Sequence, residues 1–285
     1  MLNRQGASLI ELLVAVTLAS IVLAVATSSV LRQQRTHDRI ASIAASEVQL
    51  RTATTVLANQ LSFVDAAAGD LTLGQARDTV LQFRATVGVG LACDRGTADL
   101  TLLPDTTGGV SLGGFASQPR AGDSLWFLAD STWTGTRVEA VVPASASCPA
   151  PFPVTGKTLR LTLGELNDTI QAGSPLRVTR STRYAIYRSG DGTWQLGFRE
   201  WSESTGSFSS PQPVAGPLLR QTDGRLSRFR FFGDTGDELA GSDFEARVTR
   251  IRIIIHALSR ARERGQDSVR SDSVDVALQH ASTKS

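Results

Sequence analysis

Cysteine is scarce in this chain of 285 residues, which holds only Cys93 and Cys148. The length excludes a mini-protein stapled by disulfides, because a chain of this size can bury a hydrophobic core of its own. The two cysteines form no CxxC pair and have no histidine nearby, so a zinc site is not expected. They fit one disulfide in an exported domain, or two inert thiols in a cytosolic one.

The net charge is also small: the chain has 29 Lys and Arg and 27 Asp and Glu, which gives +2. This balance provides no general attraction to nucleic acid or to acidic substrates. The four tryptophans have no basic stripe beside them and are interpreted as sheet residues. We therefore expect no direct binding of nucleic acid.

Sequence patterns of catalysis are missing as well, since there is no GxSxG, no HExxH and no phosphate-binding glycine loop. His37, His256 and His280 share no metal-ligand spacing and are interpreted as solvated side chains. The segment GDTGDELAGSD lacks EF-hand spacing and is interpreted as a turn with solvated acids. We expect no enzyme, no catalytic residue, no metal and no cofactor. A Ser/His/Asp site assembled from distant residues stays open.

Apolar sequence is concentrated near the start of the chain. Between Ala7 and Thr27 the only charged residue is Glu11. As a helix, this segment is about 31 Å long at 1.5 Å per residue, which is enough to cross the hydrocarbon core of a membrane. The sequence therefore predicts a targeting or membrane element.

Three interpretations compete for this segment. A secretory signal peptide is favoured by Arg4 before the apolar run and by the small residues at 24–26 after it. A plain transmembrane anchor explains the length. Neither of these two gives a role to Glu11, whose carboxylate is unfavourable inside an apolar span.

The third interpretation does give Glu11 a role. If the chain is cut after Gly6, Ala7 becomes a new N-terminus with a free amine, and Glu11 lies about 6 Å further along the helix as the fifth residue. Its carboxylate can then pair with the amine of a neighbouring subunit when such helices pack side by side. The unfavourable burial of the carboxylate is offset by this intermolecular ion pair.

This pattern resembles the N-terminus of type IV prepilins. The residues that carry the resemblance are basic Arg4 in a short leader, Gly6 before the cut, Glu11, and the run LIELLVAVTLASIVLAV. The resemblance implies a leader at residues 1–6 that is removed by a prepilin peptidase. It also implies that residues 7–27 cross the bacterial inner membrane once, with the C-terminal domain in the periplasm, and enter a pilus or pseudopilus after assembly.

Two positions depart from the family pattern. Ala7 stands where the family most often has phenylalanine, which leaves methylation of the new N-terminus open. Ser28 stands where many major pilins have a helix-kinking proline, so we expect a straighter helix.

The helix is expected to continue beyond the apolar span. No proline or glycine occurs between Ala7 and Ala68, which predicts one helix of up to about 55 residues. Its second half, residues 28–64, is expected to be amphipathic, with an apolar stripe. We expect this stripe to cover the core of the following domain, with contact to helices of neighbouring subunits as the alternative. Its members are Ile40, Ile43, Leu50, Thr54, Leu57, Leu61 and Val64.

Residues 65–285 have short runs with two-residue alternation, separated by Gly, Pro, Asp and Ser. This texture predicts an antiparallel β-rich domain, so the expected fold class is α+β and pilin-like, with the long helix packed on the sheet. We expect strands at Thr79–Thr86, Ser124–Ala129, Thr136–Val142, Thr158–Thr162 and Leu176–Thr179, a hairpin at YAIYRSGDGTWQLGF, and strands at LSRFRFF, RVTRIRIIIHAL and SVDVAL.

Three details of this domain are also predicted. In RVTRIRIIIHAL, Ile251, Ile253 and Ile255 share one face of a half-buried strand. The segment from Leu91 to Gly122 is expected to be a long irregular excursion that carries Cys93. The proline-rich stretch SASCPAPFPV is expected to be a loop that carries Cys148, and export would favour a disulfide between the two loops.

The resemblance extends, with less sharp motifs, to the C-terminal part. The segment RFRFFGDTGDE, followed by VTRIRIIIHAL and a last short strand, is similar to PilW-type minor pilins and to J-type minor pseudopilins of type II secretion. The length also fits the minor class.

This similarity implies a structural subunit that helps to initiate or cap a type IV pilus, which serves motility, adhesion or DNA uptake. A J-type minor pseudopilin is the alternative. The implied partners are other minor and major pilins or pseudopilins, the prepilin peptidase and the inner membrane. A membrane-anchored exported binding protein or enzyme is the alternative from another class.

Overall fold

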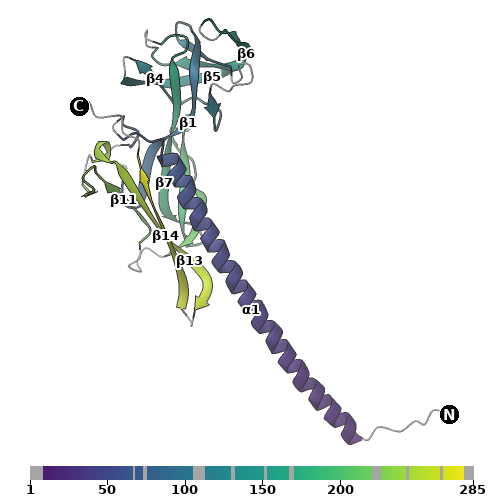
Figure 1. The fold of residues 1–285 in the computed structure, drawn as a ribbon. Helices are drawn as coiled ribbons and strands as arrows, with labels where there is room; N and C mark the ends of the chain where they lie inside the picture. The colour runs from purple at the N-terminus through teal and green to yellow at the C-terminus, as the bar shows by residue number, and fades with distance from the viewer. Residues whose placement is uncertain are drawn as a thin grey trace, which may run out of the picture.

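The protein is described here by a computed structural model in which one long helix projects from a β-rich domain (Figure 1). This arrangement confirms the predicted α+β, pilin-like fold. The structure describes residues 9–66, 68–72, 76–104, 113–129, 132–150, 153–166, 170–219, 226–241, 244–263 and 266–278.

The helix α1 runs without interruption over Leu9–Leu61, which confirms the expected single helix. Only its C-terminal part is covered by the domain, because its buried side chains begin at Ser46. The predicted apolar stripe is correct from Leu50 onward, but it is wrong at Ile40, whose side chain is 60% exposed. The buried residues of α1 are Ser46, Leu50, Ala53, Thr54, Leu57 and Leu61.

The domain is built on one continuous antiparallel network of strands. Its elements are β1 (Val80–Arg95), β2 (Asp99–Leu102), β3 (Gly114–Phe115), β4 (Ser124–Ala129), β5 (Thr132–Ser147), β6 (Thr155–Leu163), β7 (Pro175–Arg188), β8 (Trp194–Ser202), β9 (Ser207–Phe208), β10 (Gln212–Leu218), β11 (Arg228–Phe232), β12 (Glu238–Leu239), the short 3-10 helix η1 (Glu245–Arg247), β13 (Arg250–Glu263) and β14 (Gln266–Ala277).

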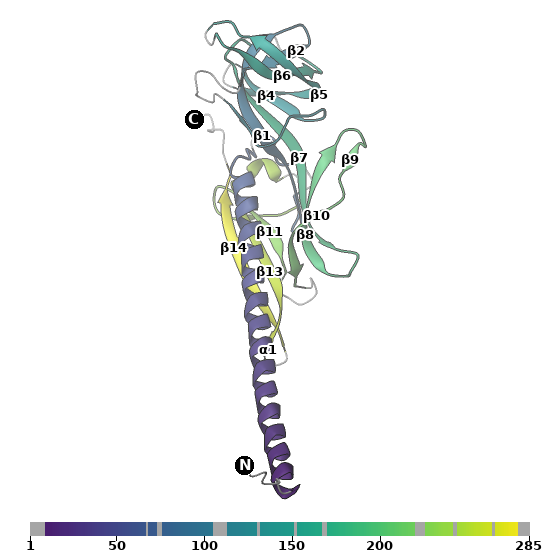
Figure 2. The same ribbon diagram turned by 90° about the vertical axis from the view of Figure 1, so that its right-hand side faces the viewer.

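The part of the network near α1 is a sheet in which β13 pairs with β14 on one side and with β11 and β10 on the other. Figure 2 shows α1 lying along β13 and β14. Ile251, Ile253 and Ile255 are all at most 2% exposed and pack in the core with α1, as predicted for one face of this strand. Arg252 and His256 lie on the opposite face and are half-buried.

Six strands at the far end of the domain close into a ring. β1 pairs with β2, β2 with β6, β6 with β5, β5 with β4, β4 with β7, and β7 again with β1, in each case antiparallel. This barrel has its own core, which includes Leu100, Phe127 and Leu161. The long strands β1 and β7 run through both the barrel and the sheet under α1, and they join the two parts (Figures 1 and 2).

Barrel closure corrects one prediction. The segment from Leu91 to Gly122 is not a continuous irregular excursion, because β1 extends to Arg95 and the segment also contains β2 and β3. Residues 105–112 of this segment lie outside the described residues. By contrast, the hairpin between β7 and β8 turns at Ser189 to Gly192 as predicted, with Gly192 at φ +83°.

Candidate assembly site on the N-terminal helix

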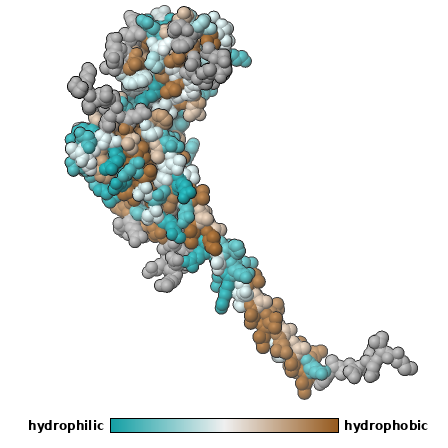
Figure 3. All heavy atoms as spheres, in the orientation of Figure 1, coloured by the Kyte–Doolittle hydropathy of each residue, from teal (hydrophilic) through white to brown (hydrophobic). Residues whose placement is uncertain are grey.

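Glu11 lies in the first turn of α1 on a stretch of helix that the domain does not cover. The residues around it expose most of their apolar surface, with exposed fractions of 78% for Leu9, 72% for Ile10 and 63% for Leu12. By its length and composition α1 is long and apolar enough to cross a membrane, and the domain leaves this apolar length uncovered. Figure 3 shows this brown apolar length of helix outside the domain.

The hydroxyl groups of this apolar length are bonded within the helix itself. Thr17 Oγ1 donates to the Val14 carbonyl at 2.9 Å, Ser20 Oγ to the Thr17 carbonyl at 2.8 Å, and Thr27 Oγ1 to the Leu23 carbonyl at 2.7 Å. Such bonds leave no hydroxyl donor facing the surroundings. The span between Leu9 and Thr27 is therefore suited to a medium without water.

Glu11 is the single charged residue from Leu9 to Leu31. Its place in the first turn is favourable for a carboxylate, because the N-terminal end of a helix carries a partial positive charge. Charged residues return directly after this stretch, with Arg32 and Arg35 both exposed. The uncharged stretch after Glu11 is about 30 Å long, which matches a hydrocarbon core.

The two predicted processing residues, Gly6 and Ala7, lie outside the described residues. The structure therefore places the assembly residue Glu11 and leaves the pairing of its carboxylate with an amine as a prediction.

Three polar contacts, which the sequence did not predict, hold α1 on the domain. Thr54 Oγ1 donates to Asp272 Oδ2 at 3.1 Å, and Arg270 on the same strand lies 3.8 Å from Glu47. Near the end of the helix, Tyr184 OH donates to Gln60 Oε1 at 3.0 Å. They add to the apolar packing of Leu50, Leu57 and Leu61 against the sheet.

Burial of Tyr184, which is only 1% exposed, raises the pKa of its hydroxyl. This tyrosine therefore stays protonated and can keep donating its hydrogen bond to the helix. The sequence alone does not say which helix residue accepts this bond.

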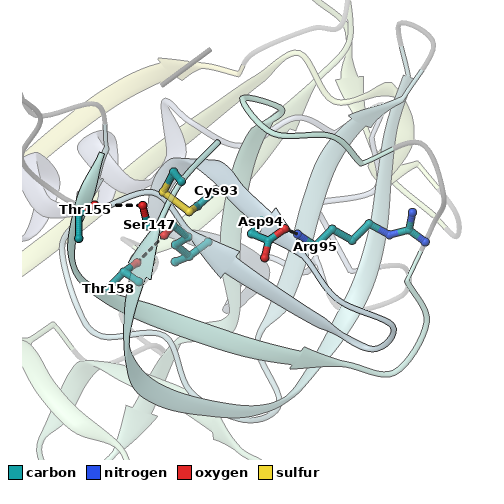
Figure 4. The surroundings of a disulfide bond; sticks show 8 residues. Cys93, Asp94, Arg95, Ser147, Thr155 and Thr158 are labelled. Atoms are coloured by element: carbon teal, nitrogen blue, oxygen red, sulfur yellow. Dashed lines mark hydrogen bonds between the residues drawn. A yellow bond between two sulfur atoms is a disulfide. The ribbon is translucent and has the colours of Figure 1, made fainter. Parts of the chain in front are cut away.

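Cys93 and Cys148 form a disulfide, with their Cα atoms 5.0 Å apart (Figure 4). Cys148 directly follows β5, whereas Cys93 lies within β1 and not in a loop, which corrects the expected location. β1 and β5 are not neighbours in the ring, so the bond ties together two separate parts of the barrel. Both cysteines are buried, and the Cys148 amide also donates to the Val154 carbonyl.

The remaining candidates are placed as follows. His37 is exposed on α1, His256 Nδ1 lies 2.7 Å from Ser271 Oγ, and His280 lies outside the described residues. GDTGDELAGSD includes the turn between β11 and β12, where Glu238 pairs with Arg230, while its last acid falls outside the described residues. Within the described residues, no group of three or more His, Cys, Asp or Glu is arranged to hold a metal ion. The tryptophans lie in strands β4, β5 and β8, as predicted.

Residues 1–27 match the family model of the prokaryotic N-terminal methylation motif. No curated protein and no solved structure matches the chain. The matched motif covers the leader, Glu11 and the apolar length of α1, and these fit a membrane-anchored pilin that is a substrate of prepilin peptidase. This motif on a long apolar helix, with an α+β domain behind it, is consistent with a type IV prepilin-like pilin.

Proposed function

We propose that this protein is a minor pilin, a structural subunit and not an enzyme, that helps to initiate or cap a type IV pilus. It is inserted once in the inner membrane with its domain in the periplasm, and it is cleaved after Gly6. Its partners are other pilins, which it meets through the apolar length of α1.

The observation that carries the proposal is the apolar length of α1, which the domain leaves uncovered and which contains one carboxylate. A span that served only as an anchor has no need of Glu11, and removing its carboxylate from water when helices pack together is unfavourable by several kcal/mol. An amine at residue 7 on an adjacent helix offsets this penalty when both groups are desolvated together. The matching methylation motif supports an amine at that position.

The large two-part domain supports a specialised subunit, because it adds a closed barrel to the sheet that packs on α1. A J-type minor pseudopilin of type II secretion has the same helix chemistry and is the alternative. The genes beside this one discriminate between them, since further pilin genes favour the pilus and secretion-channel genes favour type II secretion.

Mass spectrometry of the protein purified from membranes tests the proposal. We expect Ala7 as the first residue of the mature chain. A mature chain that begins at Met1, or near Thr27 as after signal-peptide cleavage, would overturn it.

A further inference from the structure

The face of the sheet that points away from α1 carries a cluster of arginines. Register places Arg230 opposite Arg252, Phe232 opposite Arg250, and Arg228 opposite Ile254 on β11 and β13. The alternate residues of the same strands, such as Ile251 and Ile253, are buried on the α1 side. We call the outward set of Arg228, Arg230, Phe232, Arg250 and Arg252 the arginine face.

Phe232 organises the arginine face. The guanidinium carbons of Arg250, Arg252 and Arg230 lie 4.6, 5.3 and 5.5 Å from the centroid of its ring. Cation–π contacts of this kind hold the planar guanidinium groups over the ring and limit their rotation. The side chains of Arg250 and Arg252 still expose 37% and 36% of their surface, so the cluster is accessible.

Two carboxylates lie among these arginines. Arg230 binds both oxygens of Glu238, and Arg252 binds both oxygens of Asp275, with Nε to Oδ1 at 2.6 Å and Nη2 to Oδ2 at 2.8 Å. Arg250 also approaches Asp275, at 3.6 Å. Three guanidinium groups therefore share two carboxylates, and Arg228 adds a fourth positive charge, so the positive charges of this set exceed the negative ones.

We propose that the arginine face is a docking surface for a carboxylate-rich segment of a partner protein. Accessible arginines held in place by an aromatic ring lose little freedom on binding, and their planar forks match carboxylates in pairs. The two internal carboxylates already show the geometry that an acidic partner would take. This surface lies on the side of the sheet away from α1, so the proposal goes beyond assembly through the helix.

Membrane lipid is a less suitable partner because of its distance. Glu47 lies 20 residues beyond Thr27, which is about 30 Å along the helix. Glu47 lies next to Arg270 of β14. Thr54, which is further from the apolar span, contacts Asp272, so β14 runs away from the span toward its C-terminal end. Asp275 and the arginines around it therefore lie beyond the reach of headgroups.

Nucleic acid is also disfavoured. Phe232 is only 6% exposed beneath the guanidinium groups, so its ring is not available to stack a base. The four arginines of the face exceed its two carboxylates by only two positive charges. Binding of a nucleic-acid backbone needs many contacts between positive side chains and phosphates.

Fluorescence anisotropy with the full chain in detergent micelles and a labelled decaglutamate peptide tests the docking surface. We expect binding that weakens as salt is added. The variant Arg228→Gln/Arg250→Gln should lose about tenfold in affinity. Arg160→Gln, which removes an exposed arginine on β6 of the barrel, is the matched control and should bind as the wild type does.

The variant Glu238→Gln provides a second test, in which the expected result is tighter binding, and misfolding would not produce that result. It removes a competing carboxylate and frees Arg230, so we expect binding to become several-fold tighter. If the double variant does not fold, as judged by circular dichroism, Arg228→Gln alone serves, because that side chain is exposed. The proposal is overturned if binding is insensitive to salt, if the arginine variants bind as the wild type does, or if decalysine or a single-stranded oligonucleotide of equal length binds more tightly.

Discussion

Thr54 on α1 donates a hydrogen bond to Asp272 on β14 across 3.1 Å, although 218 residues separate them in the chain. Thr54 is only 6% exposed, so the bond is shielded from water at the place where the helix meets the sheet. It joins the first and the last parts of the fold, and it lies within the length of the helix that the domain covers.

The single hydroxyl proton of Thr54 also has the Leu50 and Arg51 carbonyls within reach, at 3.0 and 3.1 Å. Replacing Thr54 with valine should lower the free energy of unfolding by about 1 kcal/mol, because the carboxylate of Asp272 loses this donor. Thr54→Ser keeps the hydroxyl and is the matched control, with a smaller loss. Denaturant unfolding followed by circular dichroism measures both. Equal stability of the valine and serine variants would show that the hydrogen bond contributes nothing.

Glu11→Gln should leave cleavage intact and strongly reduce co-purification with partner pilins, because the charge that pairs with a neighbour's amine is lost while the shape is kept. Glu11→Asp retains the charge and should retain part of the association. Mass spectrometry checks cleavage, and pull-down from membranes checks association. Unchanged co-purification of the glutamine variant would remove the proposed role of Glu11.

Gly6→Val should leave the protein as the uncleaved precursor, because a branched side chain is placed directly at the bond that the peptidase cuts. Gln5→Ala, which changes the neighbouring residue and keeps the glycine, should be processed normally. The intact mass of each purified protein distinguishes the two forms. Normal maturation of the valine variant would contradict cleavage at this position.

Loss of the disulfide should destabilise the barrel. The bond closes a loop with a sequence separation of 55 residues, for which chain entropy gives about 4 kcal/mol. Cys93→Ala/Cys148→Ala should unfold at lower denaturant, as should the wild type with a reductant. The stability of the double variant should not change when the reductant is added. If the wild type is equally stable with and without the reductant, the prediction is refuted.

The arginine face should make stability depend on pH at the acid end. Hydrogen bonds from Arg230 lower the pKa of Glu238, and those from Arg252 lower the pKa of Asp275. Because both folded-state values are depressed, this stability is fully present above the ordinary pKa values of about 4 and is lost as the pH falls through the lowered ones. The Tm of the wild type should exceed that of Glu238→Gln/Asp275→Asn at neutral pH, and the gap should close in acid. A gap that persists at the acid end would contradict this assignment.

The sequence could predict those elements whose pattern is local. The uninterrupted helix follows from the absence of glycine and proline, and β4 spans Ser124–Ala129 as expected from its alternating residues. The inward face of β13 follows from its isoleucines. Glu11 was found because a charge in an apolar run has few explanations.

Features that depend on distant partners could not be predicted. The predicted strand ended at Thr86, whereas β1 continues through Gly88, where a side chain would collide with the ring of Phe115, so glycine is required there by a close approach. Closure of the ring rests on the pairing of β1 with β7, about ninety residues later in the chain, which no local pattern reveals. The contact of Gln60 with Tyr184 was missed for the same reason.

The inward-turned hydroxyls of Thr17, Ser20 and Thr27 have one more consequence. A helix that satisfies its own polar groups can exchange lipid neighbours for protein neighbours without making or breaking any of these hydrogen bonds. Dispersion contacts with the two apolar media are of similar strength, so they provide little preference for either one. On the proposed function, the pairing of Glu11 with an amine then decides the direction of the exchange.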